Sequence, residues 1–213
     1  MLPVNEFLTA SEVGERLDVS RETMERLERY VGLLLKWQRA INLIGPNTAQ
    51  DVWRRHILDS GQLMAHLPKT SGPVVDIGSG AGLPGMVLGI MGVPEVHLID
   101  SDYRKCAFLH EASRVTETSV QIHNARVEMA RIAPAAIVMA RAVAPLKRLI
   151  DLTQSISKRN TVFFFFKGKD FRNELTEVKN NWNMSLDVIP SYSSTEGVIL
   201  KMRSLIRVDA ADD

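Results

Sequence analysis

A glycine-rich segment at residues 76–85 contains the residue types best suited to holding a ligand. It lies directly after a short run of apolar, β-branched residues, and it reads Asp76, Gly78, Gly80, Gly82, Leu83, Pro84 and Gly85 at its informative positions. Glycine lets a backbone turn tightly and approach a ligand without a Cβ clash, and Pro84 suits the first turn of a helix. The N-terminus of a helix attracts a carboxylate or a phosphate. The segment therefore predicts a strand–loop–helix junction that binds a ligand.

Two classes of cofactor fit this loop. Gly80, Gly82 and Gly85 match G-x-G-x-x-G, the dinucleotide fingerprint. The alternative is D-x-G-x-G-x-G, in which Asp76 lies two positions before the first glycine, a pattern typical of methyltransferases that use S-adenosyl-L-methionine. A carboxylate at Asp76 would repel a pyrophosphate, but it suits the ammonium of an aminoacyl group, directly or through water. We therefore favour S-adenosyl-L-methionine over a nicotinamide or flavin cofactor.

Alternating strand and helix patterns must position this loop. Apolar runs predict strands at 74–77, 96–99, 120–122, 137–139, 162–166, 185–189 and 198–202. Helical spacing predicts helices at 84–91, 103–114, 145–153 and 171–182. The expected fold is α/β, a Rossmann-like class I methyltransferase with a seven-stranded, mostly parallel sheet over residues 71–207. The last strand should pair antiparallel, because its connection is too short for a helical crossover.

The second predicted strand ends in Asp100, where a carboxylate can accept hydrogen bonds from both ribose hydroxyls of a bound cofactor. That role serves either class of cofactor, so Asp100 does not decide between them. Ligands bind outside the carboxyl ends of strands in open α/β sheets. We therefore expect Asp76, the glycines and Asp100 at one edge of the sheet.

Residues 1–70 predict a helical cap packed on the main domain, and residues 208–213 a tail. Thr9 and Glu12 have capping-box spacing, and Ser20 can cap a second helix. A third helix is expected at 48–66. Its residues His56 and Asp59 are three positions apart on one helix face, a spacing that predicts a hydrogen bond between them.

Composition narrows the class of protein. The 213 residues are 45% hydrophobic and 24% charged, with a net charge of +1. An apolar run long enough to span a membrane is missing, and so is a signal pattern, so we expect a cytoplasmic protein with no membrane partner. The single cysteine, Cys106, excludes an internal disulfide and a multi-cysteine metal site, and its helical spacing predicts a core residue. We expect a monomer that holds no metal.

Matches beyond the loop identify a family resemblance. They cover residues 37–43, 55–60, 76–85, 104–109, 125–128, 141–144 and 167–169. In these segments and in their order, the chain resembles the bacterial 16S ribosomal RNA 7-methylguanosine methyltransferases (glucose-inhibited division protein B) from about residue 25 to 205. The resemblance implies S-adenosyl-L-methionine-dependent N7 methylation of one guanosine in 16S ribosomal RNA, with 16S RNA or the small ribosomal subunit as partner.

The resemblance also implies roles for individual residues. It places cofactor contacts at Gly78, Leu83, Val127, Glu128 and Arg141, with Val127 and Glu128 beside the adenine and Arg141 near the methyl donor. One position departs from the family, because Ala136 stands where an acidic residue is common. A role for an acidic side chain there is therefore not expected in this chain.

Guanine N7 carries a lone pair and no proton, so its methylation needs no general base and can depend on alignment and electrostatics. Arginine is the usual donor to the guanine edge. We name Arg141 and Arg126 as candidate catalytic residues, contacting O6 or a phosphate because a contact to N7 would block the reaction. A salt bridge at a strand end is the alternative role for Arg141.

Ribosomal RNA binding would require focused basic charge, since the net charge is close to zero. Candidate clusters are Arg54–His56, Arg104–Lys105, Lys147–Arg148, Lys158–Arg159, Lys167 with Lys169 and Arg172, and Arg203 with Arg207. Among these we predict RNA contacts for the cluster at 167–172. Two alternatives stay open: a methyltransferase acting on a small molecule or protein, and a non-catalytic RNA-binding protein.

Overall fold

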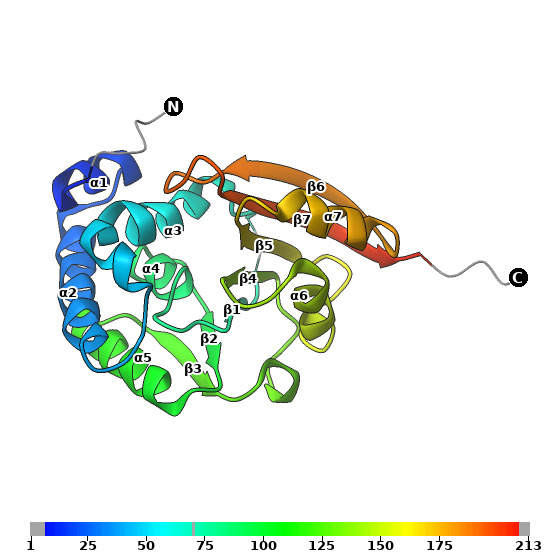
Figure 1. Ribbon diagram of the computed structural model, residues 1–213. Coiled ribbons are helices and arrows are strands. Elements are labelled where there is room, and N and C mark those ends of the chain that lie inside the picture. Colours follow the sequence, from blue (N-terminus) through cyan, green and yellow to red (C-terminus); the bar gives the residue numbers. More distant parts are fainter. Residues whose placement is uncertain (1–6, 70, 209–213) are drawn as a thin grey trace, which may run out of the picture.

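The computed structural model describes residues 7–69 and 71–208, which form one mixed sheet flanked by helices (Figure 1). The strands are β1 (Val74–Ile77), β2 (Val96–Asp100), β3 (Val120–Asn124), β4 (Ile137–Arg141), β5 (Val162–Lys167), β6 (Trp182–Pro190) and β7 (Val198–Arg207). Their order is β3-β2-β1-β4-β5-β7-β6. The first five strands pair in parallel, whereas β7 runs antiparallel to β5 and β6. The predicted fold, with an antiparallel last strand, is confirmed.

Helices cover both faces of the sheet. They are α4 (Gly85–Ile90), α5 (Tyr103–Thr116), α6 (Leu146–Thr153) and α7 (Phe171–Lys179). Figure 1 shows α4 and α5 on the side of the N-terminal helices, and α6 and α7 on the other side. The side chains of β5 alternate between the two cores: Phe164 packs toward the cap and α4, whereas Phe163 and Phe165 pack toward α6 and α7.

The N-terminal helices share one hydrophobic cluster with the sheet. They are α1 (Ala10–Leu17) and α2 (Arg21–Gln38), and the predicted caps at Thr9 and Ser20 are both present. Leu27 and Leu34 of α2 are fully buried in the cluster that contains α4 and α5. The cap therefore contributes to the same core as the sheet.

The helix expected at 48–66 is irregular. It consists of a 3₁₀ turn (Pro46–Asp51), a π-helical turn (Trp53–Leu58), a short α3 (Asp59–Gly61) and a second 3₁₀ turn (Gln62–His66). All residues from 56 to 63 are buried. A segment buried on every side has no amphipathic periodicity, and sequence spacing therefore cannot define its turns.

The C-terminal boundaries also differ from expectation. Helix α7 ends at Lys179 and Trp182 begins β6, where it pairs with Arg207 of β7. Both strands are longer than predicted. Their outer parts alternate between partly buried and exposed residues, so the continuous apolar runs in the sequence covered only part of each strand. In the described residues we find no helix with the length and apolar character required to cross a membrane.

Candidate active site

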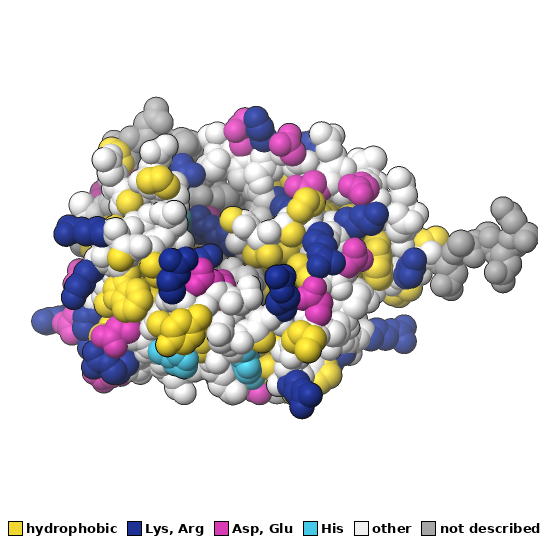
Figure 2. Space-filling view, turned by 60° about the horizontal axis from the view of Figure 1, so that its bottom comes forward, with side chains coloured by type: hydrophobic (Ala, Val, Ile, Leu, Met, Phe, Trp, Pro, Cys, Tyr) yellow, Lys and Arg dark blue, Asp and Glu magenta, His cyan; other side chains and the backbone are white. Residues whose placement is uncertain are grey.

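A cleft of about 540 Å³ lies between the carboxyl ends of β1 and β4 and the N-terminal cap, within the size range of ligand sites. It is lined by residues 42–46 and by Thr48, His56, Gly78, Ser79, Gly80, Ala81, Leu83, Lys105, Arg141 and Ala142. Turning the molecule so that α5 and β3 come forward shows a hollow in the surface with Lys and Arg side chains beside it (Figure 2). Four of the predicted cofactor residues, Gly78, Gly80, Leu83 and Arg141, thus meet in one cleft.

Asp76 lies under the glycine loop and is fully buried. Its Oδ2 accepts a hydrogen bond of 2.9 Å from the Gly85 amide, and its Oδ1 has no protein partner. Burial raises the pKa of Asp76 to about 7, opposed by the hydrogen bond from Gly85. Asp76 therefore fixes the loop from below through Oδ2, while its Oδ1 stays buried without a hydrogen-bond partner outside the lining of the cleft.

The loop glycines are required for different reasons. A Cβ at Gly85 would lie 2.8 Å from the Asp76 Cβ, so close packing under the loop excludes a side chain. Gly80 has a left-handed φ of +56°, and a Cβ there would approach nothing closer than the Gly78 carbonyl oxygen at 3.8 Å. Gly80 therefore faces open space in the cleft, where a ligand can approach the backbone.

Asp100 supports the same loop from the neighbouring strand. Its Oδ2 accepts a 2.8 Å hydrogen bond from the Gly80 amide, and its Oδ1 accepts one of 2.8 Å from the Asp102 amide. A carboxylate offers about four acceptor sites. Asp100 thus fixes Gly80 and still has acceptor capacity for hydroxyl groups.

Arg141 ends β4 and points into the cleft with its side chain 18% exposed. Its Nη2 donates a 2.7 Å hydrogen bond to the Arg55 carbonyl, and its Nη1 lies 3.4 Å from Asp59 Oδ2. Burial lowers the pKa of Arg141, while the charge of Asp59 acts in the opposite direction. Nη1 makes no hydrogen bond, so the guanidinium is both ion-paired and able to donate.

The predicted hydrogen bond between His56 and Asp59 is wrong. His56 Nε2 lies 2.8 Å from Thr48 Oγ1, whereas Asp59 Oδ1 accepts hydrogen bonds from Ser191 Oγ at 2.5 Å and Gln62 Nε2 at 2.7 Å. The irregular turn that carries them directs the two side chains toward different partners. Asp59 instead connects the cap to the loop between β6 and β7.

His56 is uncharged at neutral pH. Burial, followed by the nearby charges of Arg141 and Arg55, lowers the pKa of His56 to about 3. It lines the cleft, and its Nδ1 is buried without a partner. A histidine with so low a pKa is a poor proton acceptor, which argues against general base catalysis by His56.

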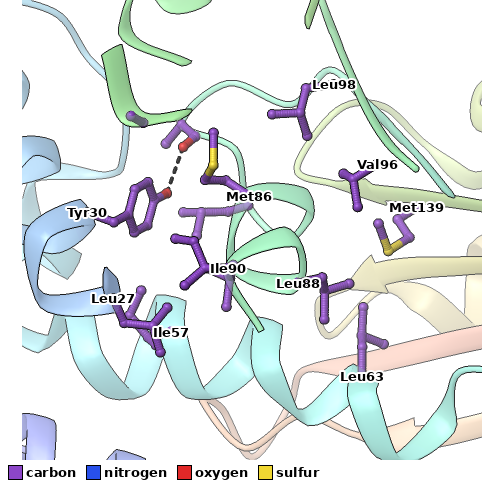
Figure 3. Close-up of a cluster of buried hydrophobic side chains, with 14 of the residues drawn as sticks. Leu27, Tyr30, Ile57, Leu63, Met86, Leu88, Ile90, Val96, Leu98 and Met139 are labelled. Atoms are coloured by element: carbon purple, nitrogen blue, oxygen red, sulfur yellow. Dashed lines mark hydrogen bonds between the residues drawn. The ribbon is translucent and has the colours of Figure 1, made fainter. Parts of the chain in front are cut away.

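Tyr30 is a site residue that the sequence patterns did not single out. It is fully buried in α2, and its hydroxyl donates a 2.7 Å hydrogen bond to the Ala81 carbonyl of the glycine loop (Figure 3). Its ring packs against Phe108, with centroids 6.2 Å apart. Tyr30 falls within the apolar stripe of α2, so its spacing resembled that of a core residue, and only its hydroxyl indicated a polar partner.

The candidates that follow β3 lie outside the lining of the cleft. Arg126 is exposed, and Val127 is 8% exposed. Glu128 forms a salt bridge of 3.0 Å with Arg148 on the surface. The Ala125 amide binds the Asp100 carbonyl, so this segment still lies beside the end of β2.

The predicted basic cluster at 167–172 is exposed at Lys169 and Arg172 but not at Lys167. The side chain of Lys167 is 7% exposed and its Nζ lies 2.6 Å from Glu174 Oε2 and 2.8 Å from the Ala144 carbonyl oxygen. Arg54 is likewise buried against Asp51. Lys105 is the lysine that reaches the cleft lining. Cys106 is 2% exposed, as expected of a core residue.

Comparison with known proteins identifies the family. The family model described as rRNA small subunit methyltransferase G matches residues 23–200. The chain belongs to this family. Proteins named ribosomal RNA small subunit methyltransferase G are 46% identical in Rhodospirillum rubrum (94% of this chain, 100% of that one) and 47% identical in Paramagnetospirillum magneticum (89% and 92%).

Solved structures support the fold of this methyltransferase family member. A putative S-adenosyl-L-methionine-dependent methyltransferase from Methanococcus maripaludis is 14% identical with a TM-score of 0.57, covering 84% of this chain and 94% of that one. A glycopeptide N-methyltransferase complexed with S-adenosyl-L-homocysteine is 8% identical with a TM-score of 0.56, covering 68% and 88%. The chain therefore has the class I methyltransferase fold.

Proposed function

We propose that this protein transfers the methyl group of S-adenosyl-L-methionine to N7 of one guanosine in 16S ribosomal RNA. One observation carries the choice of atom: the described residues that line the cleft include no carboxylate, because Asp76 is fully buried under the glycine loop, and their one histidine has a pKa of about 3. Such a site favours an acceptor atom with a free lone pair and no proton to remove, as guanine N7 has. The names of the relatives support small-subunit RNA as the substrate.

The residues present fit the cofactor. Asp76 Oδ1 is a buried atom without a hydrogen-bond partner, and it is the oxygen that would bind the ammonium end of the aminoacyl group, directly or through water. Gly80 leaves room in the cleft, and Asp100 retains acceptor capacity for a ribose. We assign the adenine side to Val127 and Glu128. When bound, the sulfonium supplies the methyl group.

Arg141 would then act on the guanine edge through electrostatics. N7 and O6 are neighbouring acceptors, so a donor at O6 orients the base and leaves N7 free. Methylation of N7 gives the purine a positive charge, which a lone arginine would oppose. The ion pair with Asp59 at 3.4 Å reduces that repulsion. We propose that Arg126, exposed at the same edge of the sheet, contacts a phosphate.

The decisive experiment uses labelled S-adenosyl-L-methionine with small subunits, or 16S RNA, from cells that lack this enzyme. We expect label in a single 7-methylguanosine, identified by mass spectrometry of the RNA. Label in protein or small molecules would support a different methyltransferase, and an absence of cofactor binding by calorimetry would support a non-catalytic RNA-binding protein. We propose a monomer in the cytoplasm, which sedimentation and fractionation test.

A further inference from the structure

A second cavity, of about 740 Å³, lies between the outer faces of α2 and α5. We call it the aromatic groove, and its lining is Leu33, Lys36, Trp37, Tyr103, Cys106, Ala107, His110, Glu111, Arg114 and Asn124. Tyr103 is 75% exposed, which is unusual for so large an apolar ring. Trp37 is held edge-on by Phe108, with ring centroids 5.7 Å apart. In the groove, Trp37 is thus fixed by its contact with Phe108, whereas the ring of Tyr103 is open to solvent.

A third, polar cavity lies beside the candidate active site. It is about 340 Å³ and is lined by residues 38–42, Asp102, Arg104 and Lys105. Asn42 and Lys105 also line the cofactor cleft. At its other end, Gln38 and Arg104 directly follow Trp37 and Tyr103 of the groove. The polar cavity thus borders the cleft and adjoins the groove through residues that are neighbours in sequence, and we call the two cavities together the path.

This path is more basic than the chain as a whole. Its two cavities are lined by five basic residues (Lys36, Arg39, Arg104, Lys105, Arg114) and two acidic ones (Asp102, Glu111), a local charge of +3 against +1 for the chain. The acidic residues are engaged, with Arg114 2.6 Å from Glu111 and Arg104 3.5 Å from Asp102. Within the described chain, Lys36, Arg39 and Lys105 form no salt bridge, so these cations can meet a polyanion.

We propose that the aromatic groove binds an unpaired nucleotide next to the target base in a single-stranded stretch of RNA. The base stacks on Tyr103, with Trp37 forming the opposite wall. Lys36, Arg39 and Lys105 contact the phosphates between the groove and the cleft. Sequence-tolerant binding of single strands combines aromatic stacking with cations along the backbone. This inference rests on the proposed function, because it assumes that the substrate is RNA.

The order of the lining residues along the path favours single-stranded RNA as the occupant. Stacking surface, phosphate-binding cations and methyl-transfer cleft succeed one another, as base, backbone and target base do in a strand. An apolar peptide would fit the aromatic wall, but it would not use the free cations of the polar cavity. When the target base leaves the stack, the neighbouring nucleotide must be bound in a fixed position, and stacking in the aromatic groove would fix it.

The test compares Tyr103→Ala with Tyr192→Ala, a matched exposed tyrosine (49% exposed) in the loop between β6 and β7. The probes are 16S RNA from cells lacking the enzyme and a 12-residue unstructured RNA containing the fluorescent base 2-aminopurine. We expect Tyr103→Ala to weaken RNA binding about 5- to 100-fold and to abolish the fluorescence quenching, whereas Tyr192→Ala behaves as wild type. Calorimetric cofactor affinity and Tm should not change.

Two further variants separate stacking from other roles. Tyr103→Phe should retain RNA binding, because stacking uses the ring, whereas Tyr103→Leu should lose it. The double variant Lys36→Gln, Arg39→Gln should reduce the slope of log K against log salt by about 0.7 for each phosphate that the protein no longer neutralises. A double variant with wild-type affinity and slope overturns the phosphate contacts.

The outcomes also distinguish this inference from the proposed function. If the wild type methylates RNA and Tyr103→Ala matches it in RNA affinity and KM, the groove proposal is refuted and the function stands. If Tyr103→Ala weakens cofactor binding instead, the groove belongs to the cofactor site and the proposal is wrong. If the wild type neither binds nor methylates small-subunit RNA, the proposed function itself fails.

Discussion

Replacing Tyr30 by phenylalanine tests whether the helical cap is part of the cofactor site. The substitution keeps the ring against Phe108 and removes only the hydroxyl that donates to the Ala81 carbonyl at 2.7 Å. Because both partners are buried, the change leaves a carbonyl without its donor, which costs about 1–3 kcal/mol. For a chain of this size each kcal/mol corresponds to a Tm decrease of about 2–4 °C.

Part of that free energy should appear in cofactor binding, because Ala81 belongs to the loop that lines the cleft. We expect the Kd for S-adenosyl-L-methionine to rise by about 3- to 30-fold, corresponding to roughly 0.6–2 kcal/mol. KM for the cofactor should rise more than kcat falls. Calorimetry and thermal denaturation measure both effects, with Tyr192→Phe as the exposed control. Wild-type cofactor affinity and Tm in Tyr30→Phe would refute a hydroxyl contact that orders the loop.

Four further substitutions test the loop and its supports. The pKa of Asp76 is raised to about 7 in the cofactor-free protein, so its free energy of unfolding should fall as pH rises from about 4 to 7 and level off above that, by at most about 4 kcal/mol. Asp76→Asn should remove this slope, seen by denaturant titration at several pH values. Because the charged carboxylate is the form that binds the ammonium group, the cofactor affinity of the wild type should rise with pH up to about 7. The affinity of Asp76→Asn should not change with pH over this range. Calorimetry measures both affinities. Gly85→Ala should destabilise the fold by about 1–3 kcal/mol because its Cβ would meet Asp76 and Leu98. Gly80→Ala makes no close contact and should destabilise the fold less, by about 1 kcal/mol for its left-handed φ, while it reduces cofactor affinity. Thermal denaturation and calorimetry measure the two effects. Asp59→Asn leaves the charge of Arg141 unpaired and should lower the free energy of unfolding by about 3 kcal/mol. This value is near the low end for buried pairs because the Arg141 side chain is 18% exposed. We also expect a lower kcat, measured by methyl transfer.

Each of these results can go against the reasoning. A pH-independent stability of the wild type between pH 4 and 7 would show that Asp76 keeps an ordinary pKa. Equal stability of Gly80→Ala and Gly85→Ala would contradict the different packing of the two positions. Full activity of Asp59→Asn would show that Arg141 does not need its carboxylate partner.

Strand–helix alternation was enough to predict the sheet because each element obeys a local rule. The apolar runs of β1, β4 and β5 are buried on both faces, and the short β6–β7 connection permits only antiparallel pairing. The segment from 46 to 66 obeyed no such rule. Its residues face the sheet, the cap and the β6–β7 loop at once, so tertiary contacts and not spacing determine its turns.

The site was predictable in the loop but not in its partners. Glycine spacing identified Gly78 and Gly80 as cleft residues, since backbone conformation is a local property. Contacts between distant segments left no such signal: Arg141 meets Asp59 across 82 residues of sequence, and Asp59 meets Ser191 across 132. Tyr30 was missed for the same reason, because a helix position does not reveal which loop its hydroxyl reaches.

The position of β7 determines when the sheet can be completed during folding. This strand follows the other six described strands in the chain, yet it occupies the space between β5 and β6. Until residues 198–207 leave the ribosome, β5 presents an open edge that can pair with other chains. The loop that brings Ser191 to Asp59 also closes only when β7 docks. A chain truncated before β7 should therefore lack the contact between Ser191 and Asp59 and leave an aggregation-prone fragment.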